Sequence, residues 1–367
     1  MLYINDGDEI PLDKKFHKIH NLCAIVYDQL TEIFSQENYS TLNSTIFNID
    51  KDNNLDIEKL VNGEIHALDW LKSNELNDEI RQVLVKHVTM SVLADFVNFI
   101  FESLSCAMRG KMSVAYALLR KPFTDELLIF EQILDNDEDF INRFFHDGEP
   151  SNYDPSARNI DKRKIIKNAL KKSKPNIVFN SELIYELRYD KTLGKGINGI
   201  SNHALHIVTN DKNYKTTEQN LNFVFSTNED VLKYWKNYYF LVPYLLIYSV
   251  SVVDNIISQF LTFNESKHFL NVKVMIRLIG ILLWDEWIDG EKNKYSKIFE
   301  LLAEKLKLDC EECGANIELE RSDFELFLES GTFICPNCFN GLINSPTAIK
   351  GINEFIELLK KLKEPGT

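Results

Sequence analysis

The segment "NYYFLVPYLLIYSVSVV", residues 237–253, runs for 17 residues without a charged side chain. This length is at the lower limit for a helix that crosses a lipid bilayer. Pro243 interrupts the segment, two serines dilute it, and Asp254 follows it directly. We therefore expect a buried core helix and no membrane contact. The segment would belong to one long bent helix that begins at a Thr227 cap.

Helical spacing of apolar residues also occurs before this segment. It extends through residues 14–36 and 75–119, and Gly110 and Pro122 are expected to interrupt or bend the helical chain around the end of the second stretch. The chain contains only 14 glycines and 9 prolines, which favours helices over a glycine-rich β-sandwich. Alternating residues in "NHALHIVT" and "LNFVFS" predict one short β-hairpin. The expected fold class is mainly α, a multi-helix bundle.

The most specific motif is "CEECGANIELERSDFELFLESGTFICPNC", residues 310–338. Two Cys-x-x-Cys pairs bracket 21 residues, a spacing at which four thiolates can close a tetrahedron around one zinc ion. With four cysteines and no spare ligand, the site is closed. We therefore expect one structural Zn²⁺ in a small zinc ribbon, with these ligands: Cys310, Cys313, Cys335 and Cys338.

The charge of this motif limits what it can bind. Eight carboxylates and a single base, Arg321, lie between residues 309 and 338, so the net charge is −7. Affinity for a phosphate backbone depends on Lys and Arg side chains. The motif should therefore repel nucleic acid, and its expected role is to hold the fold together or to dock a protein.

The length of the chain, 367 residues, suits two or three folding units. Turn-forming residues crowd into "DGEPSNYDPSA", residues 147–157, which is the best linker candidate. Four of the six cysteines lie in the motif, and the N-terminus shows no signal-peptide pattern, so we expect a reducing cytoplasm. The expected regions are an N-terminal helical part (1–150), a helical part with the basic segment and the histidine loop (151–305), the zinc ribbon (306–345) and a C-terminal amphipathic helix (346–367).

The formal net charge of −14 argues against binding of nucleic acid over the whole surface. One segment is different, because residues 158–174 carry eight Lys or Arg against one Asp. This segment is the one expected nucleic-acid contact, through these side chains: Lys162, Arg163, Lys164, Lys167, Lys171 and Lys172.

Two sets of Arg and His residues could carry chemistry. His203 and His206 follow a segment rich in Gly and Asn, and such a pair can transfer protons or bind a metal. Arg120 ends an apolar helical run, where it could face the histidines or form an internal ion pair. Arg81 and His87, six residues apart on a helix, are the alternative set. Ordinary core or surface roles remain open for both sets.

Two segments, "AYALLRKPFTDELLIFEQILDNDEDFINRFF" and "ELRYDKTLGKGINGISNHALHIVT", are together similar to an uncharacterised group of bacterial all-helical proteins related to HEPN domains. The pattern of that group is an Arg that ends an apolar helix, a carboxylate a few residues later, and a Ser-x-x-x-His-type loop. Arg120 and Glu126 match its first half, and Ser201 with His203 or His206 matches the second. The spacing after Ser201 departs by one residue, so the matching histidine stays open.

The resemblance spans roughly residues 85–260 and implies a HEPN-like bundle that acts on RNA or a nucleotide. Arg81 and His87 also fit the Arg-x(4–6)-His signature of HEPN ribonucleases, but Gln82 follows the arginine where Asn, Asp or His is usual. In those enzymes the pair lies in a dimer cleft and assists attack by an RNA 2′-hydroxyl, a reaction that needs a proton acceptor and a cation but no metal. The resemblance further implies a toxin or an anti-phage defence factor.

The competing interpretation is a non-enzymatic interaction protein. The zinc ribbon and the final amphipathic helix, "AIKGINEFIELLKKLK", would then form a docking or dimer surface for a protein partner.

Overall fold

The structure is a computed structural model that describes residues 1–46, 57–174, 176–261 and 264–361. Within these ranges the fold is mainly α, as expected, with fourteen α-helices and one two-stranded sheet. The helices before the central one are α1 (His17–Ser35), α2 (Ile57–Val61), α3 (Ala67–Ser73), α4 (Asn77–Met108), α5 (Met112–Arg120), α6 (Leu127–Ile141), α7 (Lys162–Lys172), α8 (Ser181–Tyr189) and α9 (Ile197–Leu205). The later elements are α10 (Asn228–Ile257), α11 (Asn264–Asp289), α12 (Ser296–Lys305), β1 (Leu308–Asp309), β2 (Asn316–Ile317), α13 (Arg321–Ser330) and α14 (Pro346–Lys361).

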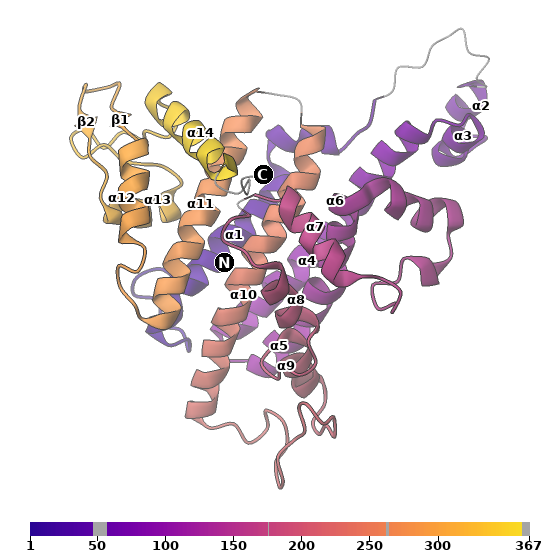
Figure 1. The fold of residues 1–367 in the computed structure, drawn as a ribbon, viewed down its shortest axis with the longest axis horizontal. Helices are drawn as coiled ribbons and strands as arrows, with labels where there is room; N and C mark the ends of the chain where they lie inside the picture. The colour runs from indigo at the N-terminus through magenta and orange to yellow at the C-terminus, as the bar shows by residue number, and fades with distance from the viewer. Residues whose placement is uncertain (47–56, 175, 262–263, 362–367) are drawn as a thin grey trace.

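The apolar segment of residues 237–253 forms the middle of α10, which runs through the centre of the molecule (Figure 1). The Thr227 hydroxyl accepts a hydrogen bond from the Asp230 amide, and the Asp230 carboxylate accepts one from the Thr227 amide, so the expected cap is present. Pro243 lies inside the helix and is buried. α10 packs against α1, α4, α6, α7 and α11, so helices from both sides of residue 150 share one core.

Two helices are long and apolar enough to cross a membrane by length and composition. In α10, 89% of the apolar window is buried inside the protein. The other helix, α4, has 44% of its window buried, and its exposed positions include His87, Ser91, Asn98 and Glu102. α10 is therefore a core helix by its burial, whereas α4 buries one face and exposes polar residues on the other.

The interruption expected near Gly110 separates α4 from α5. Gly110 has φ +74°, a conformation that glycine adopts without steric cost. After α5, residues Lys121–Glu126 form a π-helical turn with Pro122 near its start, and α6 follows without a gap. A second π-helical turn, Asn142–Asp147, ends where the expected linker (residues 147–157) begins, and a 3₁₀ turn, Pro150–Asn152, lies within that linker.

The two segments expected to form a β-hairpin do not form strands. Residues 202–205 end α9, and residues 206–227 form a loop without regular strands. Asn222 donates hydrogen bonds from its backbone to the Ile207 carbonyl (2.8 Å) and from its side chain to the His206 carbonyl (2.7 Å). Side-chain hydrogen bonds of this kind satisfy backbone groups that would otherwise pair in a β-ladder. The short antiparallel pair of the described chain is β1–β2 in the zinc ribbon, with Leu308 opposite Ile317.

The zinc ribbon lies at one side of the molecule, at the upper left in Figure 1, next to α12 and α14. α14 packs against α11 and α12 and buries one apolar face, formed by Ala348, Ile352, Phe355 and Ile356. The C-terminal region therefore continues the core of the helical body as far as Ile356.

Candidate functional site

The four cysteines of the motif lie in two turns of the same geometry. The amide of Gly314 donates to the carbonyl of Cys310 over 2.8 Å, and the amide of Phe339 donates to the carbonyl of Cys335 over 2.8 Å. The residue after the second cysteine has a positive φ in both turns, +70° at Gly314 and +60° at Phe339. These paired turns bring both thiols of each pair to one place.

The four thiols form a cluster that can hold one metal ion. Their Sγ atoms all lie within 4.8 Å of one another, with 3.5 Å between Cys310 and Cys338 and 3.6 Å between Cys313 and Cys335. A disulfide would need about 2.05 Å. A regular tetrahedron with metal–sulfur bonds of about 2.3 Å has edges of about 3.8 Å, close to these separations. The expected four-cysteine site is confirmed as a metal-binding geometry.

Within the described ranges, two ion pairs join the ribbon to the helical body, and one of them is Lys18 on α1 with Glu325 on α13, 3.0 Å apart. Arg321, at the start of α13, binds both carboxylate oxygens of Glu286 on α11. Burial acts to raise the pKa of Glu286, but the Arg321 guanidinium outweighs it and the pKa is lowered. The only base of the acidic motif is therefore engaged inside the protein, which leaves the outer surface of the ribbon negative.

Two residues of the expected set, Arg120 and His203, approach one loop residue, Tyr214. The Nε2 atom of His203 contacts the carbonyl oxygen of Tyr214, and the two rings meet edge to face at 5.9 Å. Burial raises the pKa of the Tyr214 phenol, and nearby Asp211 adds to this, whereas the positive charge of Arg120 opposes it. Arg120 and His203 therefore approach the same residue from α5 and α9, two helices that pack closely.

The hydrogen bond of His203 fixes which ring nitrogen can act as a base. A carbonyl oxygen only accepts hydrogen bonds, so Nε2 carries the proton and Nδ1 is left as the acceptor. Arg120 is exposed and has no ion-pair partner among the residues that the structure describes. His206 is exposed at the end of α9, three residues after His203. Its backbone carbonyl is bound by Asn222, and its ring makes no recorded hydrogen bond within the described ranges.

The alternative set, Arg81 and His87, is not brought together in the same way. Arg81 forms an ion pair with Asp137 on α6, with 2.7 Å between Nη2 and Oδ2. Six residues correspond to about 600° of helical rotation, so the two side chains leave α4 about 120° apart. Arg81 lines a cavity of about 460 Å³, and His87 is not among the lining residues of that cavity.

The basic segment forms α7, which begins at Asp161, whose carboxylate accepts a hydrogen bond from the Lys164 amide. Its six expected contact residues divide into two groups. Three of them contact other residues of the chain: Lys162 the Ala157 carbonyl and the Tyr189 ring, Arg163 the exposed Glu182 and the Tyr185 ring, and Lys172 the carbonyls of Leu134 and Asp135.

The other three, Lys164, Lys167 and Lys171, are exposed. Their spacing of i, i+3 and i+7 places them in one row along the helix. None of them has an ion-pair partner in the described part of the chain. This row is an uncompensated positive surface on a protein with a formal net charge of −14.

Next to Arg120, the π-helical turn carries a pair of carboxyl groups. Lys121 contacts Asp95 on α4 and lies 3.3 Å from Glu126. Burial, then the neighbouring Asp95, raises the pKa of Glu126 from 4.5 to about 8, while Lys121 opposes the shift. The pKa of Asp95 is lowered, first by its hydrogen bond with Glu126 and next by the one with Lys121. At neutral pH, Glu126 therefore keeps its proton and Asp95 is ionised.

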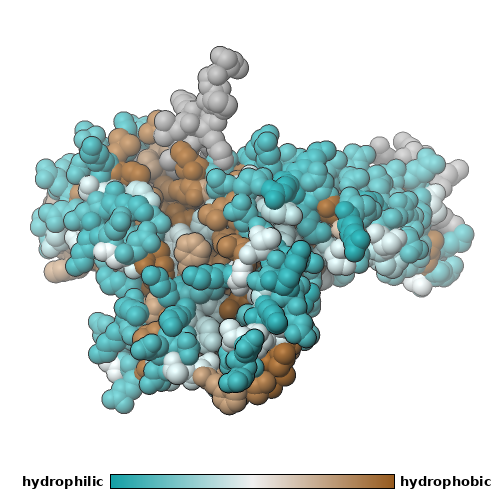
Figure 2. Space-filling model, turned by 60° about the horizontal axis from the view of Figure 1, so that its bottom comes forward, coloured by the Kyte–Doolittle hydropathy of each residue, from teal (hydrophilic) through white to brown (hydrophobic). Residues whose placement is uncertain are grey.

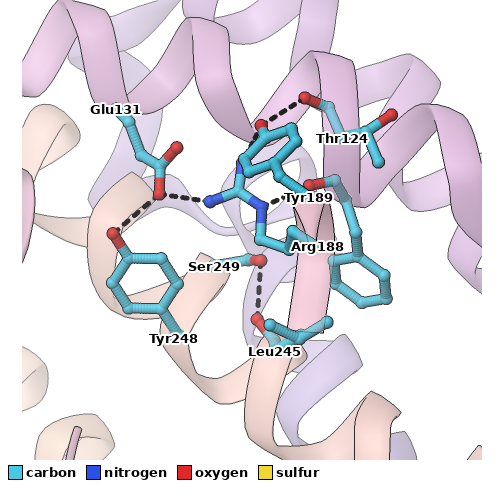
Figure 3. A network of polar contacts seen from close by, with 8 residues as sticks. Thr124, Glu131, Arg188, Tyr189, Leu245, Tyr248 and Ser249 are labelled. Carbon is cyan, nitrogen blue, oxygen red and sulfur yellow. Dashed lines mark hydrogen bonds and ion pairs between the residues drawn. The ribbon is translucent and has the colours of Figure 1, made fainter. Parts of the chain in front are cut away.

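A buried ion pair holds this turn in place from the inside (Figure 3). Arg188 and Glu131 are both 0% exposed, and their side chains are 2.6 Å apart. Arg188 also donates to the Phe123 carbonyl (2.5 Å) and to the Tyr189 hydroxyl (2.9 Å), and Tyr248 donates to Glu131 (2.8 Å). The network joins α6, α8 and α10 to the turn that follows Arg120.

Sequence reasoning missed most of these supporting residues. Glu126 was noted through the resemblance, but its partner Asp95 lies 31 positions earlier in a helical pattern and carries no local signal. Tyr214 lies in a segment without a motif. Arg188 and Glu131 are ordinary helix residues in the sequence, and only a fold that buries both could identify them as a pair.

Comparison with models of known protein families, with curated proteins and with solved structures found no match.

Proposed function

We propose that this protein binds single-stranded RNA along α7 and cleaves it, without a catalytic metal, at Arg120 and His203. The observation that carries the proposal is the row of unpaired lysines, Lys164, Lys167 and Lys171, on an otherwise acidic chain. Phosphate contacts of this kind supply the sequence-independent part of nucleic-acid affinity. α8 packs against both α7 and α9, so a strand bound on the lysines could extend toward His203.

The proposed reaction is attack of an RNA 2′-hydroxyl on the adjacent phosphorus. Nδ1 of His203 removes the hydroxyl proton, the 2′-oxygen forms a bond to phosphorus, and the bond to the 5′-oxygen breaks. The positive charge of Arg120 stabilises the phosphorane. His206, exposed at the end of α9, donates the proton that the leaving 5′-oxygen takes up. The products are a cyclic 2′,3′-phosphate and a free 5′-hydroxyl.

The binding step is tested by replacing the three lysines together, Lys164→Gln, Lys167→Gln and Lys171→Gln. We expect weaker binding of a single-stranded RNA and a decrease of about 2 in the slope of log affinity against log salt, at about 0.7 per phosphate contact. The control is Lys292→Gln, Lys297→Gln and Lys305→Gln, three exposed lysines in or just before α12, a helix that lies across α10 from α7 in Figure 1. An equal loss of affinity in both triple variants would mean that only total charge matters and would reject the α7 site.

The cleavage step is tested with His203→Ala, His206→Ala and Arg120→Ala on a single-stranded RNA carrying a 5′ label. Each change should lower the rate about 10²-fold or more, the range for loss of a general acid or base. A substrate with 2′-deoxy nucleotides should not be cleaved. Unchanged cleavage by the His203→Ala/His206→Ala double variant would exclude this site and direct attention to Arg81 and His87.

We propose a structural Zn²⁺ for the four cysteines, because four thiolates leave no open position for a substrate. In line with the HEPN-like resemblance, the proposed setting is a bacterial cytoplasm in which the protein acts as a toxin or an anti-phage factor. Expression of the native chain should then arrest growth, and expression of the His203→Ala/His206→Ala variant should not.

A second candidate is a non-enzymatic scaffold that docks a protein, or a second copy of the chain, through the zinc ribbon. The apolar face of α14 is already occupied inside the protein. The observation that favours this candidate is the exposure of Phe339 and Leu326 on the ribbon, 79% and 42%. Phe339→Ser with Leu326→Ser should then abolish partner capture or self-association, measured by pull-down and by light scattering, while RNA binding stays unchanged.

A further inference from the structure

A cavity of about 860 Å³ opens where the zinc ribbon meets the helical body. One wall comes from α1 and α11, and the other comes from the end of α13 and from residues 343–349. Small-molecule sites typically measure about 300–1,000 Å³ and often lie between folding units. The cavity is distinct from the hollow on the face shown in Figure 2, where apolar residues gather between the zinc-ribbon side and the body.

The lining of this cavity combines apolar side chains with charges of mainly one sign. Ile25, Val272, Ile276 and Leu328 supply apolar surface. Three carboxylates and one ammonium group also line it: Asp28, Glu32, Glu329 and Lys273. The net charge of the lining is therefore −2.

Only one of the three carboxylates is neutralised inside the cavity. Lys273, which is buried, lies 2.6 Å from Glu32 and donates to the Tyr39 hydroxyl over 3.0 Å. Asp28 on α1 and Glu329 at the end of α13 are exposed and have no ion-pair partner among the residues described. These two carboxylates stand on different walls of the cavity, and both are free to bind a cation.

A buried amide in the same wall has an unused donor. Gln29 is 4% exposed, and its Oε1 accepts a hydrogen bond from Nη1 of Arg277 over 2.7 Å. A guanidinium only donates, so this bond fixes the orientation of the amide. Nε2 of Gln29 is left without a partner in the described structure. A buried donor without an acceptor is energetically unfavourable, and a ligand with an acceptor group would satisfy it.

From these features we propose that the cavity binds a small organic amine that carries an apolar body and a hydrogen-bond acceptor. The ammonium group lies between Asp28 and Glu329, the apolar body contacts Val272 and Leu328, and the acceptor receives the hydrogen bond of Gln29. This site is separate from the lysines of α7 and from Arg120, so it adds a ligand to the protein independently of the proposed RNA cleavage.

The first test compares two probes that differ in one charge. L-phenylalanine amide has the ammonium, the apolar ring and an amide carbonyl, and its N-acetyl derivative keeps the ring and this carbonyl but carries a neutral acetamido group in place of the ammonium. We expect saturable calorimetric binding of phenylalanine amide to the metal-loaded full chain, at least about tenfold tighter than binding of the N-acetyl form. Tenfold corresponds to about 1.4 kcal/mol, the contribution of one well-formed charge contact.

The second test changes the two unpaired carboxylates. Asp28→Asn and Glu329→Gln should each weaken phenylalanine amide about threefold to tenfold, and together they should remove the preference over the N-acetyl probe. Both residues are exposed and neither forms an ion pair within the described ranges, so folding should be preserved. The matched control is Glu300→Gln, an exposed carboxylate on α12 that does not line the cavity and should leave both affinities unchanged.

Several outcomes would overturn the proposal. Equal affinity for the two probes would show that the carboxylates do not select a cation. Unchanged affinity in the double variant would place any binding elsewhere. Absence of saturable binding by phenylalanine amide would mean that the cavity holds solvent only.

Discussion

The helical body and the zinc ribbon are held together by different means. The body surrounds α10, in which residues Leu241 to Val253 are all buried, and it closes one large apolar core. The ribbon, about residues 306–345, has two strands of two residues each and one ten-residue helix. Units of about 40 residues rarely bury enough apolar surface to fold without a metal or disulfides. We therefore expect the ribbon to depend on a metal bound by its four cysteines, whereas the body depends on its core.

The apolar part of the ribbon itself is small and aromatic. Phe327 and Phe333 stack at 4.4 Å, Phe324 meets Phe333 at 5.8 Å, and Phe299 of α12 meets Phe324 at 5.4 Å. This cluster joins the ribbon to α12 but does not enclose the cysteines, two of which are exposed. Loss of one stabilising interaction in the ribbon should therefore unfold the ribbon alone. Loss of one in the body should lower the stability of the whole body.

Removal of the metal should produce the largest effect. Structural zinc contributes apparent binding free energies of about 10–16 kcal/mol in small zinc modules, and that energy is folding energy. We expect a strong chelator, or Cys335→Ser, to unfold residues 308–345. Hydrogen exchange should show loss of amide protection there, while α4 and α10 stay protected.

The free cysteines provide the control for this experiment. Cys23 is buried in α1 and lies outside the metal cluster, so Cys23→Ser should leave the chelator response unchanged apart from a small loss of core stability. If the amides of α10 lost protection together with those of the ribbon, the two regions would unfold as one cooperative unit. The distinction between a metal-dependent ribbon and a core-dependent body would then be wrong.

Glu131→Gln tests the body in the same manner. The change leaves the Arg188 guanidinium buried without a counter-charge, and loss of one partner from a buried pair costs about 3–5 kcal/mol. We expect this decrease in the free energy of unfolding by urea, measured by circular dichroism of the whole chain. Unlike metal removal, it should affect every helix that packs around α10.

An exposed ion pair of the same residue types serves as the matched control. Arg163 and Glu182 face solvent with side-chain exposures of 52% and 58%, and such pairs contribute about 0–1 kcal/mol. Glu182→Gln should therefore have little effect. The double change Glu131→Leu with Arg188→Met should recover most of the stability, because no charge remains buried. Failure of this recovery would mean that the hydrogen bonds to the π-helical turn matter more than the charge.

The third prediction concerns pH and Glu126. Its pKa is raised in the folded chain from 4.5 to about 8, so the folded state holds the proton more tightly than the unfolded state. Its stabilising contribution is therefore complete below about pH 4.5 and is lost as the pH rises toward 8. At about 1.4 kcal/mol per pKa unit, reduced for the solvent around Asp95 and Lys121, the loss is about 2–3 kcal/mol.

Glu126→Gln removes this titration without changing the size of the side chain. The variant should match the native chain at pH 4.5 and exceed it by about 2–3 kcal/mol at pH 8.5, measured by urea unfolding across that range. Asp125→Asn, a change in the neighbouring exposed carboxyl, is the control. A constant difference between variant and native chain at every pH would show that Glu126 does not carry the proton.

The sequence predicted some of these features and not others for a physical reason. The metal cluster follows from local spacing, because four thiols in two tight turns need few other residues to define them. α10 follows from its uninterrupted apolar pattern. The pair Arg188 and Glu131 and the pair Asp95 and Glu126 join helices that are distant in the sequence, so they depend on packing that no local pattern specifies. For the same reason, Arg81 and His87 satisfied a helical spacing although the fold directs them apart.

In the loop of residues 206–227, a local sequence pattern predicted strands that the fold does not form. Alternating apolar residues predicted strands, but several of these side chains, among them Ile207, Val208, Val224 and Phe225, are exposed. A two-residue period indicates a strand only when one face is covered, and nothing in the described structure covers this one. Figure 2 shows apolar residues gathered at the lower tip of the molecule, where this loop lies.

The smallest effect is expected at the two turns of the ribbon, which provide a comparison within one module. Gly314 and Phe339 occupy the same left-handed position, but an L-residue pays about 1–2 kcal/mol there that glycine does not. Phe339 is 79% exposed, so little packing would be lost on replacement.

Phe339→Gly should therefore stabilise the metal-loaded ribbon by about 0.5–1 kcal/mol, after the greater freedom of glycine in the unfolded chain is subtracted. Gly314→Ala should destabilise it by about 1 kcal/mol, and the measurement is competition for the metal with a chromophoric chelator. If both changes shifted metal affinity in the same direction, the matched turns would not contribute through backbone strain.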